Sequence, residues 1–228
     1  MIRVAVCDDH AIVRKGLTQI LSEVGDISVV IEASHGGDLR QRLRDTPCDV
    51  VLIDIEMPGK NGIEVVALLK KEWPKLHAIV LSIYPEDQYA VRALRAGAAG
   101  YINKTSAPDK VIDAVRQVAS GRKFISVEVS QALADAVAGE TPELPHQSLS
   151  DREFQVLKLI AHGKKLSEIA ETLALSPKTV SVYRARIMEK MHLAGNVDLA
   201  RYAITHNLLD GASSGALSGA VSGASSST

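Results

Sequence analysis

Four charged side chains stand just after apolar segments, where they could act together. Asp8 and Asp9 follow the first apolar run of the chain, Asp54 follows a second, and Lys104 follows a third. Three converging carboxylates would repel one another, so a hard divalent cation such as Mg2+ is their natural ligand. The lysine would supply a point charge for a phosphoryl oxygen. The combination indicates phosphoryl chemistry.

Asp54 is the residue expected to react. It ends an apolar run typical of a strand buried on both faces, and the chain then turns through Pro58 and Gly59. Packing alone explains such a carboxylate poorly. The other groups have ordinary explanations when taken singly, since Asp8 could cap the next helix and Lys104 could be a solvated loop charge. Their order after separate apolar strands argues against coincidence.

Alternating strands and helices must bring these side chains to one place. The pattern predicts a doubly wound α/β fold with a five-stranded parallel sheet and right-handed crossovers. The carboxyl ends of its strands share one edge, where ligands bind. The expected strands are Ile2 to Cys7, Ser28 to Ala33, Val50 to Ile53, Ala78 to Ser82 and Gly100 to Ile102. The clearest helices are Ile12 to Val24, Gly62 to Glu72, Asp87 to Ala96 and Pro108 to Ser120.

A second, all-helical domain is expected after residue 147. Ser150 and Glu153 have the spacing of a capping box at the start of a first helix. A short helix follows, and Ser176 with Pro177 then begins a third helix that runs to about Met191. A short helix, a tight turn and a longer helix form the helix-turn-helix pattern.

The third helix has two distinct faces when residues are placed about 100° apart. One face is mostly apolar, and the other carries small side chains with cations beside it. The apolar face comprises Val180, Tyr183, Ile187 and Met191, and the small face comprises Lys178, Ser181, Val182 and Ala185. Such a surface can enter a major groove while cations meet phosphates. A solvated helix face is the alternative, and the helix-turn-helix setting favours DNA.

Composition sets limits on the remaining classes. The chain has 228 residues and a net charge of −1, so overall charge gives no argument for nucleic acid. Cys7 and Cys48 are too few for a disulfide framework and lack metal-ligand spacing. We expect no signal peptide and no membrane span, and therefore a cytoplasmic protein.

Residues 1–125 resemble the receiver domain of bacterial two-component response regulators, which implies a flavodoxin-like fold. The residues that carry this resemblance are Asp8, Asp9, Asp54 with its Met-Pro-Gly turn, Ser82, Tyr101 and Lys104.

The resemblance implies that Asp54 accepts a phosphoryl group from a sensor histidine kinase. It also implies that Mg2+ binds Asp9, Asp54 and the backbone carbonyl of Glu56, with Asp8 acting largely through water. Lys104 would contact the phosphoryl oxygen.

Two further residues would respond to the phosphoryl group in this family. Ser82 would swing toward it, and Tyr101 would rotate inward. Thr105 follows Lys104 where many receivers have proline, so their cis peptide bond cannot be assumed here.

The second domain resembles the four-helix LuxR-type DNA-binding domain, and the pair of domains resembles the NarL/FixJ response regulators. The motifs are Leu149 to Glu153, Glu168 to Ala170, Leu175-Ser176 and Lys178 to Tyr183. By family position, Ser181, Val182 and Ala185 would face base edges. Lys178, Thr179, Arg184, Arg186 and Lys190 would lie near phosphates. A domain of this size reads few base pairs, so a homodimer is expected when the protein is phosphorylated.

The expected organisation is a receiver domain (1–125), a linker (126–147), a DNA-binding domain (148–210) and a disordered Gly/Ala/Ser tail (211–228). Within the linker, Val127 to Ala138 could form a helical turn or two, and Gly139 to Pro145 breaks any regular structure. The favoured function is a transcription regulator and not an enzyme. Two alternatives stay open: a Mg2+-dependent aspartyl-phosphate enzyme, and a regulator whose helical domain binds protein instead of DNA.

Overall fold

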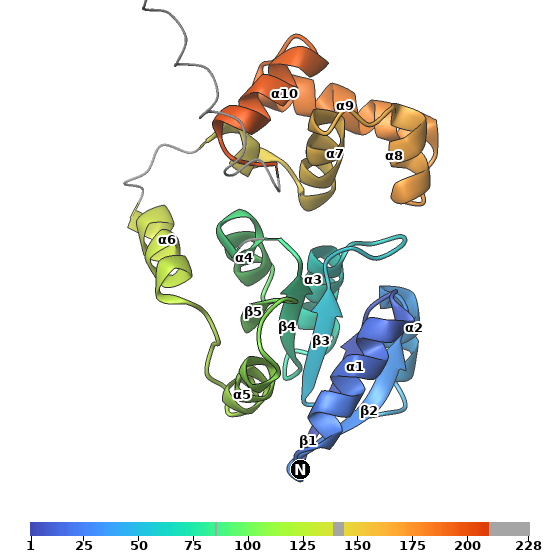
Figure 1. The fold of residues 1–228 in the computed structure, drawn as a ribbon, viewed down its shortest axis with the longest axis vertical. Coiled ribbons are helices and arrows are strands. Elements are labelled where there is room, and N and C mark those ends of the chain that lie inside the picture. The colour runs from blue at the N-terminus through green and yellow to red at the C-terminus, as the bar shows by residue number, and fades with distance from the viewer. Residues whose placement is uncertain (85, 139–143, 210–228) are drawn as a thin grey trace, which may run out of the picture.

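A computed structural model describes residues 1–84, 86–138 and 144–209 of the chain. An α/β domain is followed by a helical domain above it (Figure 1). The strands are β1 (Ile2–Cys7), β2 (Ile27–Ala33), β3 (Val50–Asp54), β4 (His77–Ser82) and β5 (Gly100–Asn103). The helices of the first part are α1 (Ala11–Ser22), α2 (Gly36–Arg42), α3 (Gly62–Glu72), α4 (Glu86–Arg95), α5 (Pro108–Ala119) and α6 (Val127–Ala138). The second part has the short 3-10 helix η1 (Pro145–Ser148), then α7 (Asp151–Ala161), α8 (Leu166–Thr172), α9 (Pro177–Met191) and α10 (Asn196–Thr205).

The five strands form one sheet in the order β2-β1-β3-β4-β5, with all neighbours parallel. This is the doubly wound, flavodoxin-like order, so the predicted fold class is confirmed. The strand order reverses between β1 and β3, and Asp8 and Asp54 lie at the carboxyl ends of these two strands. The sheet thus places both acids at the switch point of the fold.

Alternate side chains of the strands fill two apolar cores. One face of the sheet packs against α1 and α5, through residues such as Leu21 and Val115. The other face packs against α2, α3 and α4, through residues such as Leu39, Val66 and Ala90. Strand β3 is buried along its whole length because helices cover both faces.

The turn after Asp54 is fixed by hydrogen bonds at the start of α3. The Asn61 side chain accepts from the Glu64 N–H at 2.8 Å, and the Glu64 carboxylate accepts from the Asn61 N–H at 3.1 Å. The Gly62 N–H donates to the Ile55 carbonyl at 2.9 Å, which folds the chain tightly against the end of β3. A capping box therefore anchors the loop that follows Asp54.

Helix α6 is longer than the sequence pattern suggests. One or two helical turns were expected in the linker, whereas residues Val127–Ala138 form a continuous helix. Val129 is buried and Leu133 packs against the same core as α4, which α6 flanks in Figure 1. Packing on the receiver explains this helix better than its intrinsic propensity does. Most of the segment predicted to lack regular structure, residues 139–143, lies outside the described residues, and so does the predicted disordered tail.

Helix α7 begins with the predicted capping box. The Glu153 carboxylate accepts from the Ser150 N–H at 2.8 Å, and the Ser150 hydroxyl accepts from the Glu153 N–H at 3.3 Å. Ser176 caps α9 by accepting from the Thr179 N–H at 3.0 Å, and Pro177 occupies the first turn. Both helix starts are confirmed.

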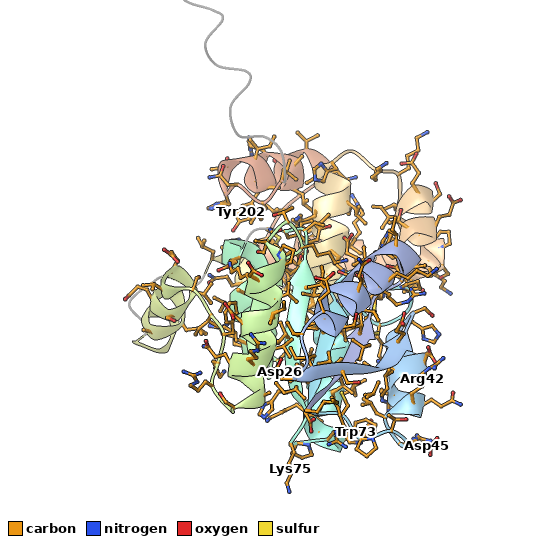
Figure 2. The ribbon with its side chains drawn as sticks, turned by 60° about the horizontal axis from the view of Figure 1, so that its bottom comes forward. Asp26, Arg42, Asp45, Trp73, Lys75 and Tyr202 are labelled. Carbon is orange, nitrogen blue, oxygen red and sulfur yellow. The ribbon has the colours of Figure 1, made fainter. Side chains whose placement is uncertain are left out.

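The chain has a single tryptophan, Trp73, which directly follows α3. It lies with Lys75 at the end of the molecule opposite Tyr202 of α10 (Figure 2). Trp73 therefore reports on the receiver alone. No helix within 1–84, 86–138 and 144–209 is both long and apolar enough to span a bilayer.

Candidate functional site

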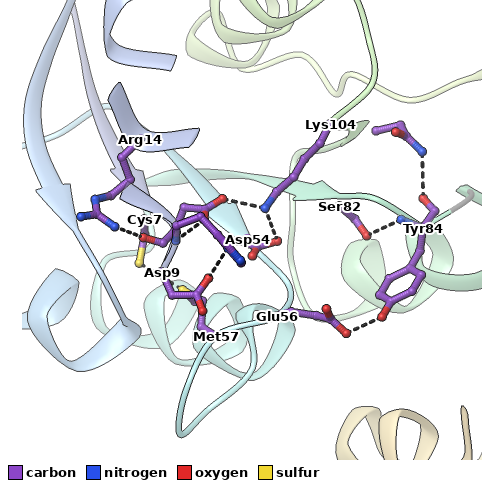
Figure 3. A network of polar contacts seen from close by, with 12 residues as sticks. Cys7, Asp9, Arg14, Asp54, Glu56, Met57, Ser82, Tyr84 and Lys104 are labelled. Carbon is purple, nitrogen blue, oxygen red and sulfur yellow. Dashed lines mark hydrogen bonds and ion pairs between the residues drawn. The ribbon is translucent and has the colours of Figure 1, made fainter. Parts of the chain in front are cut away.

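Lys104 joins two buried carboxylates at the carboxyl edge of the sheet. Its Nζ lies 2.6 Å from Asp8 Oδ2 and 2.9 Å from Asp54 Oδ1 (Figure 3). Asp8 is fully buried and Asp54 is 4% exposed. Asp54 is the last residue of β3, whereas Asp8 and Lys104 directly follow β1 and β5. The three groups therefore lie at strand ends, as the sequence predicts.

Burial dominates the electrostatics of this site. It raises the pKa of Asp54 to about 6, and Lys104 opposes that rise while Asp8 adds to it. Burial lowers the pKa of Lys104, but attraction to Asp54 and Asp8 more than offsets this effect, so the net shift is upward. One ammonium thus compensates the two buried carboxylates only in part.

Asp9 completes a cluster that fits a divalent cation. Potential ligand atoms of Asp8, Asp9, His10 and Asp54 all lie within 4.8 Å of one another. Asp9 Oδ1 is 2.7 Å from His10 Nδ1, and its side chain is 31% exposed, so it opens to solvent. The carboxylates carry more negative charge than Lys104 balances, and water can reach them at Asp9. Such a group of oxygen donors suits a hard cation.

Ser82, Tyr84 and Tyr101 form a connected group beside the acids. The Ser82 hydroxyl accepts from the Tyr84 N–H at 3.0 Å, and the Tyr101 hydroxyl donates to the Tyr84 carbonyl at 3.0 Å. The Tyr84 hydroxyl also bonds the Glu56 carboxylate (Figure 3). Tyr101 is already buried here, so its inward rotation stays a prediction about a change of state.

In the helical domain, the small face of α9 is open to solvent. Lys178, Ser181, Val182, Ala185 and Arg186 are exposed. The opposite face is anchored in the core by Val180, Ile187 and Met191, all buried. The two faces predicted from helical periodicity are therefore confirmed. The exposed face is accessible to a large ligand.

Three of the expected phosphate contacts have partners within the domain. Lys190 Nζ lies 2.7 Å from the buried Glu153 carboxylate, and Arg184 Nε donates to Asn196 Oδ1 at 2.7 Å. The Thr179 hydroxyl is 2.7 Å from the Ser176 hydroxyl. Lys178 and Arg186 are thus the better candidates for cations that meet phosphate.

Two family descriptions match the two domains. The response regulator receiver domain matches residues 4–116, and the family described as bacterial regulatory proteins, luxR family, matches residues 147–203.

Curated relatives match nearly the whole chain. Response regulator GacA of Pseudomonas aeruginosa is 39% identical over 214 residues, covering 93% of this chain and 100% of the relative. Response regulator UvrY of Escherichia coli K12 is 40% identical over 209 residues, covering 91% and 96%. The chain belongs to the NarL/FixJ family of response regulators. It is a regulator of transcription with a receiver domain and a LuxR-type DNA-binding domain, and its partners are DNA and a sensor kinase.

Solved structures agree with this assignment. RcsB of Salmonella enterica serovar Typhimurium, bound to promoter P1flhDC in the presence of phosphomimetic BeF3−, is 28% identical with a TM-score of 0.62. The match covers 90% of this chain and 98% of that one. A second RcsB structure, bound to promoter rprA with BeF3−, gives 27% identity and a TM-score of 0.61 over 88% and 97%.

In this response regulator the two domains touch through α4 and α7. Arg92 of the receiver donates to the carbonyls of Leu149 and His146, the former at 2.6 Å, and lies 3.5 Å from Asp151 Oδ1. Its guanidinium also stacks 4.5 Å from the Phe154 ring centroid. Burial lowers the pKa of Arg92, and Asp151 counteracts that effect. One half-buried arginine thus contacts the start of α7.

The sequence reading missed Tyr84 and His10 as members of the receiver site. Tyr84 stands two residues after Ser82 in a loop, and nothing in a single sequence shows that its hydroxyl reaches Glu56. His10 directly follows the acid pair, and this position is the signal in the sequence that could have identified it.

Proposed function

We propose that Asp54 is the phosphorylation site of this response regulator. A carboxylate oxygen of Asp54 attacks the phosphorus of a kinase phosphohistidine, so an O–P bond forms as the P–N bond breaks. The contact that carries this proposal is the ion pair of Lys104 with Asp54 at 2.9 Å, since the same ammonium can follow a phosphoryl oxygen. Ser82, which is buried beside it, is positioned to turn its hydroxyl to the phosphoryl group.

The donor set supports Mg2+ as the cofactor. Asp9, Asp54 and the backbone carbonyl of Glu56 would hold the ion, with Asp8 acting largely through water. Bound Mg2+ would supply positive charge against the phosphoryl oxygens. The cluster of oxygen ligands at the strand ends supports this choice over softer metals, although His10 adds one nitrogen to the group.

The exposed face of α9 supports DNA reading by this helix. Ser181, Val182 and Ala185 would face base edges, and their short side chains favour methyl contacts and DNA shape over long polar contacts. Lys178 and Arg186 would contact phosphates. Phosphorylation would promote a homodimer that binds paired sites.

The domain limits follow from the same proposal. The receiver would end near residue 125, and the DNA-binding domain would span 148–210, with α6 in the connecting segment. The protein would be cytoplasmic, because its DNA partner is there. It would act as a regulator and not as an enzyme that turns over small molecules.

Removing one phosphate contact should reduce the salt dependence of DNA binding. Lys178→Ala and Arg186→Ala should each make the negative slope of log K against log salt less steep by about one unit. Each change should also weaken binding to all DNA sequences alike. Fluorescence anisotropy at several salt concentrations would measure this slope. Val182→Asn should change sequence preference more than general affinity, because Val182 is exposed between the two cations on α9.

Lys123→Ala is the matched control, since Lys123 is an exposed cation of the receiver domain. Its salt slope should equal that of the wild type. Wild-type slopes and preferences in all the α9 variants would show that α9 does not read DNA, and would favour the protein-binding alternative.

A further inference from the structure

A lysine of the DNA-binding domain is buried against two tyrosines of the receiver. Lys158 of α7 is 4% exposed, and its Nζ lies 3.6 Å from the centroid of the Tyr84 ring and 5.3 Å from that of Tyr89. The two rings stack with centroids 5.0 Å apart. A buried cation needs compensation, and aromatic faces supply it. Lys158 therefore fixes the position of the Tyr84 ring from the other domain.

Tyr84 in turn contacts several parts of the phosphorylation site. Its hydroxyl bonds the side chain of Glu56, whose backbone is an expected metal ligand. Its N–H and carbonyl bond Ser82 and Tyr101, the two residues expected to move on phosphorylation. Tyr84 thus links the groups at the phosphorylation site to Lys158 through direct contacts.

A second side chain of α7 reaches the other loop beside the acceptor. Arg152 is 4% exposed and donates to the carbonyl of Gly59, in the turn that follows Asp54. Gln155 Oε1 accepts from the same guanidinium at 2.8 Å. Helix α7 thus contacts both the β3–α3 and the β4–α4 loops, which flank Asp54.

Docking of α7 on the receiver does not cover the small face of α9. Lys178, Val182 and Arg186 are exposed while α7 is docked. The receiver therefore does not cover these side chains in this arrangement. The contacts from Lys158 and Arg152 provide a different route, through the loops of the acceptor site.

We propose that Lys158 is a positioning residue for the phosphorylation site, and that the docked DNA-binding domain acts through it to oppose phosphorylation of Asp54. This coupling rests on the proposed function, in which Asp54 is the phosphorylation site. Lys158 contacts Tyr84 in the arrangement in which Lys104 pairs directly with the Asp54 carboxylate, and a contact made in only one of two states stabilises that state. Turning the Ser82 hydroxyl to the phosphoryl group would break its bond from the Tyr84 N–H and release Tyr84 from its place under Lys158. A contact that is lost on binding lowers the affinity for the phosphoryl group.

The test uses full-length protein and beryllofluoride with Mg2+ as a phosphoryl mimic. Lys158→Ala should bind the mimic about tenfold more tightly, a common size for coupling between sites, and should be labelled faster by acetyl phosphate. Lys158→Arg keeps a cation over the rings and should stay close to the wild type. Lys164→Ala removes an exposed lysine just after α7 and should change nothing. Calorimetric titration gives the affinities.

Tyr84→Phe tests the route with a smaller change. It keeps the ring under Lys158 but removes the hydroxyl that bonds Glu56, so it should also tighten binding of the mimic. The double variant should gain less than the sum of the single gains, because both changes cut the same connection. Tyr84→Phe also decides the matter if Lys158→Ala does not fold.

Three outcomes separate the possibilities. Folded variants that bind the mimic exactly as the wild type does, or more weakly, would overturn the coupling while leaving the proposed function in place. Equal gains from Lys158→Ala and Lys158→Arg would overturn the role of the cation. A wild type that binds no mimic and accepts no label would refute the proposed function itself.

Discussion

Asp54→Asn should abolish phosphorylation by acetyl phosphate or by the partner kinase. The amide cannot form an acyl phosphate, and the change also removes a negative charge from the metal cluster. Lys104 would keep its contact with Asp8, so the fold around the site should survive. Labelling followed by mass spectrometry would measure the loss and locate any remaining phosphoryl group.

Asp9→Ala is the informative control for this experiment. It removes the most exposed of the three carboxylates and leaves the acceptor in place. The apparent Mg2+ affinity should fall roughly tenfold or more, since even outer-shell changes cost about 10- to 100-fold, and labelling should slow without stopping. Full labelling of the Asp54→Asn protein at another aspartate would show that the acceptor is misassigned.

Gly62→Ala should destabilise the receiver strongly. A Cβ on Gly62 would lie 2.0 Å from the Asp54 carbonyl oxygen and 3.0 Å from the Ile55 Cα. These are backbone atoms, so they cannot move aside by a change of side-chain rotamer. Overpacking in a tight site costs about 1–3 kcal/mol, and we expect the upper end of this range here. Urea unfolding followed by Trp73 fluorescence would measure the change within the receiver.

Gly16→Ala is the matched control for backbone effects. Gly16 lies in α1, and its added Cβ would meet nothing within 4 Å. Replacing a helical glycine should stabilise the receiver by about 0.5–1 kcal/mol. If Gly62→Ala were as stable as the wild type, the tight turn behind Asp54 would not be required, and the account of how α3 fixes the acceptor would fail.

The strand ends were predictable because parallel sheets impose a simple geometry. Once the apolar runs of β1, β3 and β5 are recognised, Asp8, Asp54 and Lys104 must meet at one edge. The faces of α9 followed in the same way from helical periodicity, with Val180 and Ile187 buried and Val182 exposed. In regular strands and helices, the spacing along the sequence determines which side chains share an edge or a face.

Contacts between distant irregular segments could not be predicted. The bond from Tyr84 to Glu56 joins two loops, and the packing of Lys158 on Tyr84 joins two domains. Neither follows from periodicity, because each depends on the final positions of separately folded parts. The full length of α6 could not be predicted for the same reason, because burial of Val129 against the receiver stabilises this helix. The individual roles of the site residues stay predictions.

The central claim is that the state of Asp54 controls DNA binding by α9, and affinity for paired sites tests it most directly. Anisotropy titrations of a paired-site DNA, with sedimentation of the same samples, would compare wild type and Asp54→Asn with and without beryllofluoride and Mg2+. We predict that the mimic converts wild-type monomer to dimer and raises affinity at least about tenfold, while Asp54→Asn does not respond. Equal mass and equal affinity of the wild type in both conditions, with binding of the mimic confirmed, would contradict the account.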